Sequence, residues 1–219
     1  MFIDSLNPRV LYAAAMSGGK AYKSTDGGDS WDDIQFGFPR LGAGMAMNPG
    51  DPSLLFATSQ AGFLTSRDGG KSWKQYKTNV RVFPWLWRDP PVLEMAADGS
   101  ALYAASAAGV FKSLDGGNTW TAVGKRPAAN GPWTMRFASK HPNIIYAQAK
   151  EGVYKSTNSG KEWRAINSGL PEGLGLIRTL RALVVDPSDP NTLYVGTGGR
   201  GVFKSVNGGE SWVPAGAHY

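Results

Sequence analysis

The chain has 219 residues, of which 42% are hydrophobic and 18% charged, so a substantial core is available and a wholly disordered chain is excluded. Cysteine is absent, which excludes disulfides, thiolate zinc sites and cysteine nucleophiles and leaves the compartment undecided. The net charge of +6 is compatible with an acidic partner. No uninterrupted apolar run is long enough to cross a membrane, and the first ten residues do not resemble a secretory signal.

Short strands and tight turns are predicted from the first residues onward. A first strand ends at the Asn7-Pro8 turn, a second covers 10–15 (VLYAAA), and a third covers 20–24 (KAYKS). Four later segments repeat this order, with runs such as LLFATS and GFLTS or TLYVGT and GVFKS. A fourth strand closes each unit. We therefore expect five four-stranded units, at approximately residues 1–36, 41–78, 91–124, 133–167 and 180–216.

An eight-residue signature follows the third strand of every unit. It reads STDGGDSW, SRDGGKSW, SLDGGNTW, STNSGKEW and SVNGGESW, and its first serines are 42, 47, 43 and 49 residues apart. The aspartate or asparagine accepts backbone amide bonds in a tight turn, and the glycines permit positive φ. The closing tryptophan is expected to pack between neighbouring sheets.

Five copies of one antiparallel unit predict an all-β fold, a β-propeller of five four-stranded blades in a single domain over residues 1–219. An immunoglobulin-like sandwich is the main rival, but it does not require one signature five times. No strand is left over to complete a shared blade. The chain is therefore expected to be a monomeric ring, a fragment of a larger propeller or an oligomer that completes the circle.

The pattern Ser-x-Asp-x-Gly-x-x-Trp resembles the Asp-box, or bacterial neuraminidase repeat, and the resemblance covers the whole chain. Proteins with this repeat include sialidases, xyloglucan-active endoglucanases, sortilin-type receptors and photosystem II assembly factor-like proteins. The last group has the most similar repeats. The resemblance implies a structural role for the residues Ser24, Asp26, Trp31, Ser66, Asp68, Trp73, Ser113, Asp115, Trp120, Ser156, Asn158, Trp163, Ser205, Asn207 and Trp212.

Calcium binding or catalysis by these acids is the alternative interpretation of the signature. An EF-hand needs further oxygen ligands at fixed offsets and a closing glutamate, which the copies lack. An active site also needs one constellation of residues rather than five. We expect no metal and no cofactor.

Arginines and non-repeating aromatic residues gather in the connections between units and in one turn between the second and third strands. Propeller topology puts these connections on the face opposite the signatures. Lysines at the shared third-strand position, such as Lys23 and Lys155, are expected to be solvated or paired at the blade edge. The candidate ligand-binding residues are Arg40, Arg81, Trp85, Trp87, Arg88, Trp133, Arg136, Arg178, Arg181 and Arg200. Burial against a neighbouring blade explains Trp85 and Trp87 nearly as well as ligand contact does.

Three functions remain open from the sequence. The first is a non-catalytic propeller that binds a protein segment, an acidic glycan or another anion at this basic, aromatic-rimmed face. The second is a xyloglucanase- or sialidase-like glycoside hydrolase with acids among Asp89, Glu94 and Glu151. The third is non-specific nucleic-acid binding driven by charge, although no nucleic-acid motif is present.

Overall fold

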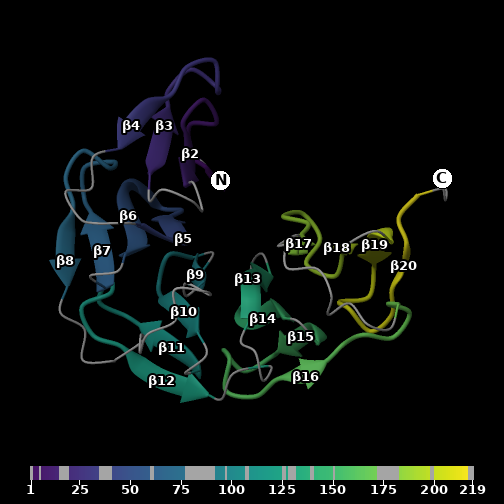
Figure 1. Cartoon of the computed structure of the whole chain (residues 1–219). Coiled ribbons are helices and arrows are strands. Elements are labelled where there is room, and N and C mark those ends of the chain that lie inside the picture. The colour runs from purple at the N-terminus through teal and green to yellow at the C-terminus, as the bar shows by residue number, and fades with distance from the viewer. Residues whose placement is uncertain are drawn as a thin grey trace. The chain divides into compact units, whose positions relative to one another are not determined.

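The computed structural model describes residues 2–4, 6–14, 20–34, 41–59, 62–76, 92–96, 98–106, 109–124, 127, 132–138, 141–149, 151–171, 183–197 and 200–216. Every regular element in these ranges is a strand, and the strands form five four-stranded antiparallel sheets (Figure 1). Within each sheet the hydrogen-bonded neighbours follow chain order. Such sheets are the blades of β-propellers, and the predicted all-β class with five four-stranded blades is confirmed. No helix long and apolar enough to cross a membrane occurs in these ranges.

The strands of each blade are called A to D in chain order. Blade 1 contains β1 (Phe2–Ile3), β2 (Leu11–Ala14), β3 (Ala21–Ser24) and β4 (Asp32–Ile34). Blade 2 contains β5 (Leu41–Asn48), β6 (Asp51–Ser59), β7 (Gly62–Ser66) and β8 (Lys74–Tyr76). Blade 3 contains β9 (Val92–Met95), β10 (Leu102–Ser106), β11 (Gly109–Ser113) and β12 (Thr121–Gly124). Blade 4 contains β13 (Pro132–Ala138), β14 (His141–Ala149), β15 (Gly152–Ser156) and β16 (Arg164–Ala165). Blade 5 contains β17 (Leu183–Val185), β18 (Leu193–Thr197), β19 (Gly201–Ser205) and β20 (Val213–Pro214).

The chain divides into two compact units. One comprises Met1–Ala104 and Phe111–Thr121, and the other comprises Ala105–Val110 and Ala122–Tyr219. The first unit holds blades 1 and 2 with most of blade 3, and the second holds blades 4 and 5. The arrangement of all 219 residues as a single domain stays a prediction.

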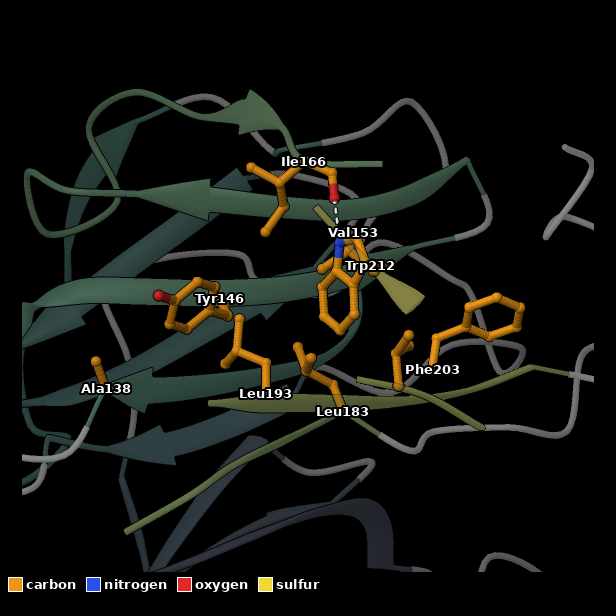
Figure 2. Close-up of a cluster of buried hydrophobic side chains, with 9 residues drawn as sticks. Ala138, Tyr146, Val153, Ile166, Leu183, Leu193, Phe203 and Trp212 are labelled. Atoms are coloured by element: carbon orange, nitrogen blue, oxygen red, sulfur yellow. Dashed lines mark hydrogen bonds between the residues drawn. The ribbon is translucent and has the colours of Figure 1, made fainter. Parts of the chain in front are cut away.

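Each unit is stabilised by apolar side chains that project from one blade onto the next. In the first unit, one cluster joins blades 1 and 2 around Tyr12, Leu55 and Leu64, and a second joins blades 2 and 3 around Phe56 and Leu102. In the second unit, a cluster joins blades 4 and 5, and Figure 2 shows it. Successive strand residues point to opposite faces, so blade 2 supplies apolar groups to blade 1 on one side and to blade 3 on the other. Blade-to-blade burial is therefore the main source of stability.

The signature tryptophans differ in burial from blade to blade. Trp120 is 2% exposed and stacks on Phe63 of the preceding blade, with ring centroids 4.4 Å apart. Trp212 is 3% exposed, and its Nε1 donates to the carbonyl of Ile166 in blade 4 at 2.7 Å (Figure 2). Trp31 in blade 1 is 39% exposed. The expected packing between blades thus holds for Trp120 and Trp212, whereas Trp31 remains substantially exposed.

A polar contact accompanies the apolar clusters and involves the shared third-strand lysines. Lys155 Nζ and Tyr146 Oη of blade 4 both donate to the carbonyl of Gly208 in blade 5, at 3.0 and 3.4 Å. Lys23 and Tyr12 of blade 1 donate in the same way to Gly69 of blade 2. Lys23 and Lys155 therefore bind the next blade, contrary to the expectation that they are solvated or paired at the blade edge. The sequence could not show this because the acceptor is a backbone carbonyl.

The Tyr–Lys contact, meaning the two donors on one signature glycine carbonyl, is modified in blade 2. Phe56 and Thr65 occupy the tyrosine and lysine positions there. Phe56 has no donor, and Thr65 Oγ1 reaches the Gly116 carbonyl at 3.5 Å. The joint between blades 2 and 3 depends instead on apolar contacts such as the Phe63–Trp120 stack.

Trp120→Ala should lower the free energy of unfolding by about 3–5 kcal/mol, because it removes a large buried ring and leaves a cavity. Trp31→Ala should cost clearly less, since that ring is already partly hydrated. Urea unfolding followed by circular dichroism measures both changes. Equal costs for the two variants would contradict the difference in burial.

Tyr146→Phe should cost about 1 kcal/mol, the usual net contribution of a hydrogen bond. The Gly208 carbonyl keeps its bond from Lys155, so the variant leaves no orphaned acceptor. Tyr22→Phe is the matched control, because Tyr22 is half-buried in blade 1 and outside the Tyr–Lys contact. Urea unfolding measures the change in the free energy of unfolding for both variants. An equal loss for Tyr22→Phe and Tyr146→Phe would contradict the role of the Tyr–Lys contact.

Candidate functional site

Most of the predicted binding residues lie outside the described residues. The backbone of Trp133 belongs to β13, while Arg136 and Arg200 are described with their side chains. For the other seven residues, the predicted role in ligand binding stays a prediction. The predicted residues outside the described ranges are Arg40, Arg81, Trp85, Trp87, Arg88, Arg178 and Arg181.

Arg200 lies in the turn between β18 and β19 and is exposed. In blade 5 this turn precedes β19 and the signature turn follows it. Arg200 therefore lies at the end of the sheet away from the signature. The adjoining backbone is fixed locally, because Thr197 Oγ1 donates to the Gly201 carbonyl at 2.7 Å. No described residue forms a hydrogen bond or ion pair with the Arg200 guanidinium. It is thus an exposed cation next to the start of β19.

Arg136 lies within β13 and is half-buried. Its Cα partner is Tyr146, which in turn is the partner of Lys155. Arg136 therefore belongs to the row of blade 4 residues that includes the Tyr–Lys contact. Its Nη1 donates to the carbonyl of Met135 at 2.6 Å. The predicted approach of Arg136 to Arg181 involves a residue outside the described ranges and stays a prediction.

The five signature turns, residues 24–31 and their counterparts, share the hydrogen bonds of the serine and of the aspartate or asparagine, and four of them also share the tryptophan bond, because Trp212 donates to Ile166 instead. In blade 2, Ser66 Oγ donates to Asp68 Oδ1 at 2.8 Å and accepts from the Gly70 amide at 2.8 Å. The Ser72 amide donates to Asp68 Oδ1 at 2.9 Å, and Trp73 Nε1 donates to the Gly70 carbonyl at 3.1 Å. Both glycines of the turn have positive φ, 67° and 90°. The turn thus uses its own carboxylate as the acceptor for its backbone.

These donors determine the acidity of the signature carboxylates. The Ser72 side chain, then its amide and the Ser66 hydroxyl, lower the pKa of Asp68 to about 2. The corresponding bonds from Ser30 and Ser24 hold the pKa of Asp26 still lower, and the Thr119 hydroxyl and amide lower that of Asp115. A carboxylate held in this way is a poor proton donor. Within the described ranges no three His, Asp or Glu side chains gather in a manner that would hold a metal ion.

Blades 4 and 5 carry asparagine at the acid position of the signature. Asn158 Oδ1 accepts from the Glu162 amide at 2.9 Å, as the aspartates do, but its Nδ2 donates to the Glu162 carboxylate at 3.1 Å. Asn207 Nδ2 similarly donates to Ser211 Oγ at 2.8 Å. The amide therefore reproduces the turn without a titratable group.

The candidate catalytic acids do not form a described pair. Glu94 is half-buried in β9 of blade 3, and Glu151 is exposed in the β14–β15 turn of blade 4. Asp89 lies outside the described residues. No described geometry distinguishes two flanking carboxylates.

Gln148 is a polar residue that the sequence analysis did not select. It is 7% exposed in β14, and its Oε1 has no hydrogen-bond partner among the described residues. It lies near the end of blade 4 that carries the Glu151 turn, and its Cα partners are Thr134 and Val153. A buried acceptor of this kind requires a donor from water or a ligand. The sequence feature that could have indicated Gln148 is a long amide side chain at a strand position where blade 5 has Gly196.

Solved structures of similar fold were found, although no protein-family model and no curated protein sequence matches the chain. A glycoside hydrolase family 74 (GH74) enzyme from Niastella koreensis has a TM-score of 0.69 and 24% identity, over 96% of this chain and 37% of its own. The GH74 xyloglucanase from Xanthomonas campestris has a TM-score of 0.63 and 19% identity, over 97% of this chain and 44% of its own. YCF48 from Cyanidioschyzon merolae has a TM-score of 0.52 and 12% identity, over 96% and 82%.

These similarities show the fold, a β-propeller. The chain spans less than half the length of the two GH74 enzymes. At such identities the loops that carry chemistry are not comparable residue by residue, because one fold hosts many unrelated functions.

Asp68→Asn should make stability less sensitive to acid. A carboxyl group with a lower pKa in the folded chain than in the unfolded chain contributes stability above its ordinary pKa, and this contribution is lost as the pH falls toward the folded value. For Asp68 the window extends from about pH 4 to about pH 2. Urea midpoints across this window should therefore fall less for Asp68→Asn than for the parent.

Asn207→Asp is the opposite change at the equivalent position of blade 5. Its carboxylate would accept from the Ser211 amide and hydroxyl, so acid sensitivity should increase in the same window. If neither substitution alters the pH profile, the signature hydrogen bonds do not have the electrostatic role assigned to them.

Proposed function

We propose that this chain is a non-catalytic binding module that holds an acidic protein segment. The binding surface is the end of the blades that carries the B–C turns and the connections from each strand D to the next strand A, away from the signature turns. We further propose that the signature turns are Asp-boxes with a structural role and that all 219 residues form one propeller domain.

The exposed guanidinium of Arg200 is the observation that carries this proposal. It lies next to the start of β19 at the proposed surface and lacks a partner among the described residues, whereas Arg164 is paired with Glu210. An arginine can form two parallel hydrogen bonds to one carboxylate, which suits recognition of an Asp or Glu side chain. The predicted arginines of the connections, such as Arg40 and Arg178, would extend the same chemistry.

The arrangement of the acids supports binding over hydrolysis. The aspartates repeated in the signature accept several hydrogen bonds within their own turns, and those bonds lower their pKa. Glycoside hydrolysis generally requires one carboxyl group that keeps its proton near neutral pH and a second at a fixed separation. Glu94 lies in blade 3 and Glu151 in blade 4, and the two belong to different compact units.

Arg200→Ala should weaken binding of a fluorescein-labelled oligoglutamate peptide by roughly tenfold, the value of one charge-assisted hydrogen-bond pair. Fluorescence anisotropy at low and moderate salt measures the affinity. Arg67→Ala is the matched control, because Arg67 is also exposed but lies in the signature turn of blade 2. It should leave the affinity nearly unchanged. Neither variant should lower the melting temperature.

Three outcomes would contradict parts of the proposal. Equal effects of Arg200→Ala and Arg67→Ala would remove the proposed surface. Tighter, Arg200-dependent binding of a heparin oligosaccharide would replace the protein segment with an acidic glycan. Release of reducing sugar from xyloglucan by the parent chain, abolished by Glu94→Gln or Glu151→Gln, would overturn the non-catalytic role.

A further inference from the structure

Gln148 lies between blades 4 and 5, near the end that carries the B–C turns. It is directly opposite Val153 in the sheet, so the two side chains share one face. Val153 belongs to the apolar cluster that joins these two blades, and Figure 2 shows it beside Trp212 of blade 5. Gln148 is also the next-to-last residue of β14. Its side chain therefore faces blade 5, close to the B–C turn of blade 4.

Two buried threonines lie at the same end of these blades. Thr134 of β13 is the other Cα partner of Gln148 and is 4% exposed. Thr197 is the last residue of β18 and alternates with the buried Leu193 and Val195, so it points with them toward blade 4. We call Gln148, Thr134 and Thr197 the polar seam site.

The amide oxygen of Gln148 lacks the partner that the equivalent residue of blade 2 has. Gln148 follows Tyr146 by two residues, as Thr58 follows Phe56. Thr58 Oγ1 accepts from the Gly44 amide and donates to the Gly44 carbonyl, both at 3.3 Å, so blade 2 satisfies its own buried hydroxyl. Gln148 Oε1 is buried and has no hydrogen-bond partner among the residues that the structure describes. Such an acceptor requires a donor from water or a ligand.

A β-bulge lies next to this amide. Thr134 pairs with Gln148 and Pro132 pairs with Ala149, so Trp133 has no Cα partner in β14. Bulges of this kind interrupt the ladder locally and are frequent next to active sites, where they change the direction of a side chain. The sheet is thus irregular at the point where its buried acceptor is unpaired.

The chemistry of the unpaired oxygen determines which ligand suits it. An amide oxygen only accepts hydrogen bonds, so it favours a donor and disfavours carboxylate, sulfate or phosphate oxygens. A main-chain N–H of a peptide is such a donor. Arg200 lies in the B–C turn of blade 5, at the same end of the neighbouring blade, and offers a cation to an acidic side chain. A peptide with both N–H groups and carboxylates therefore matches both residues.

From these observations we infer that Gln148 binds the main chain of the acidic segment whose carboxylates contact Arg200, an inference that rests on the proposed function. Gln148 Oε1 accepts from one backbone N–H of the segment and gains its missing partner only in the complex. Because packed sheets lie about 10 Å apart and an extended chain advances about 3.3 Å per residue, a segment of about four to six residues spans both blades. Rotation about the side-chain torsions of Gln148 brings its amide to the nearby B–C end.

Gln148→Met removes the amide at nearly constant volume. The melting temperature of the free chain should stay the same or rise, because a buried unpaired acceptor is lost. The affinity for a fluorescein-labelled hexaglutamate should nevertheless fall by roughly five- to tenfold, the effect of one lost hydrogen bond. Thermal melting and fluorescence anisotropy measure the two quantities.

The ester analogue of hexaglutamate, in which an oxygen replaces every backbone N–H, identifies the bond. It keeps the carboxylates and has no main-chain donor. The parent chain should bind it more weakly than hexaglutamate, and Gln148→Met should not weaken its binding further, because the two changes remove the same hydrogen bond. Arg200→Ala should weaken binding of both probes equally.

Thr58→Val is the matched control, because it removes a buried polar group that is paired within blade 2. This variant should lower the melting temperature and leave the affinity for hexaglutamate unchanged. The opposite signs expected for Gln148→Met and Thr58→Val separate a residue that binds a ligand from one that serves the fold.

Two results would overturn the inference. One is a Gln148→Met variant that melts at a lower temperature and binds hexaglutamate as the parent does, which would assign the amide to a structural water. The other is an equal loss of affinity for hexaglutamate and its ester analogue, since no main-chain N–H would then take part. In both cases a weakened Arg200→Ala variant would leave the proposed function standing. A parent chain that binds neither probe would contradict the proposed function and this inference together.

Discussion

A backbone carbonyl held out by a tight turn is the interaction on which the blade arrangement depends. In each signature turn the serine hydroxyl and the carboxylate or amide side chain satisfy the local amide groups. In the turns of blades 2 and 5 the fourth residue directs its carbonyl toward the preceding blade, where a tyrosine and a lysine donate to it. Burial raises the pKa of Tyr146 to about 12, so the phenol remains a donor at any physiological pH. In these two places the signature is therefore a joint between blades as well as a turn.

This view explains which parts of the fold were predictable from the sequence. The fivefold signature and the alternation of apolar residues specify four strands per unit, and positive φ at Gly69 and Gly70 follows from the turn itself. The contact made by Lys155 was not predictable, because its acceptor lies in another blade and is a main-chain atom. Local patterns specify local structure well, whereas a partner some 50 residues away depends on how blades stack.

The candidate site was less predictable for a related reason. Repetition identifies scaffold residues, and the residues that remain are candidates for function by elimination. Elimination selects both Arg200 and Arg136 as candidate binding residues. In the structure Arg200 is exposed, whereas Arg136 belongs to the row of blade 4 residues that contacts blade 5. Gln148 was missed because it occupies a strand position, and only three-dimensional burial makes its unsatisfied oxygen noticeable.

The replacement of tyrosine and lysine by Phe56 and Thr65 makes the joints chemically unequal. All three described joints contain apolar clusters, but the two that add an ammonium and a phenol also respond to ionic competition, while the joint with stacked rings and no lysine is nearly indifferent to salt. Raising the salt concentration therefore weakens the joints that contain a lysine more than the joint between blades 2 and 3.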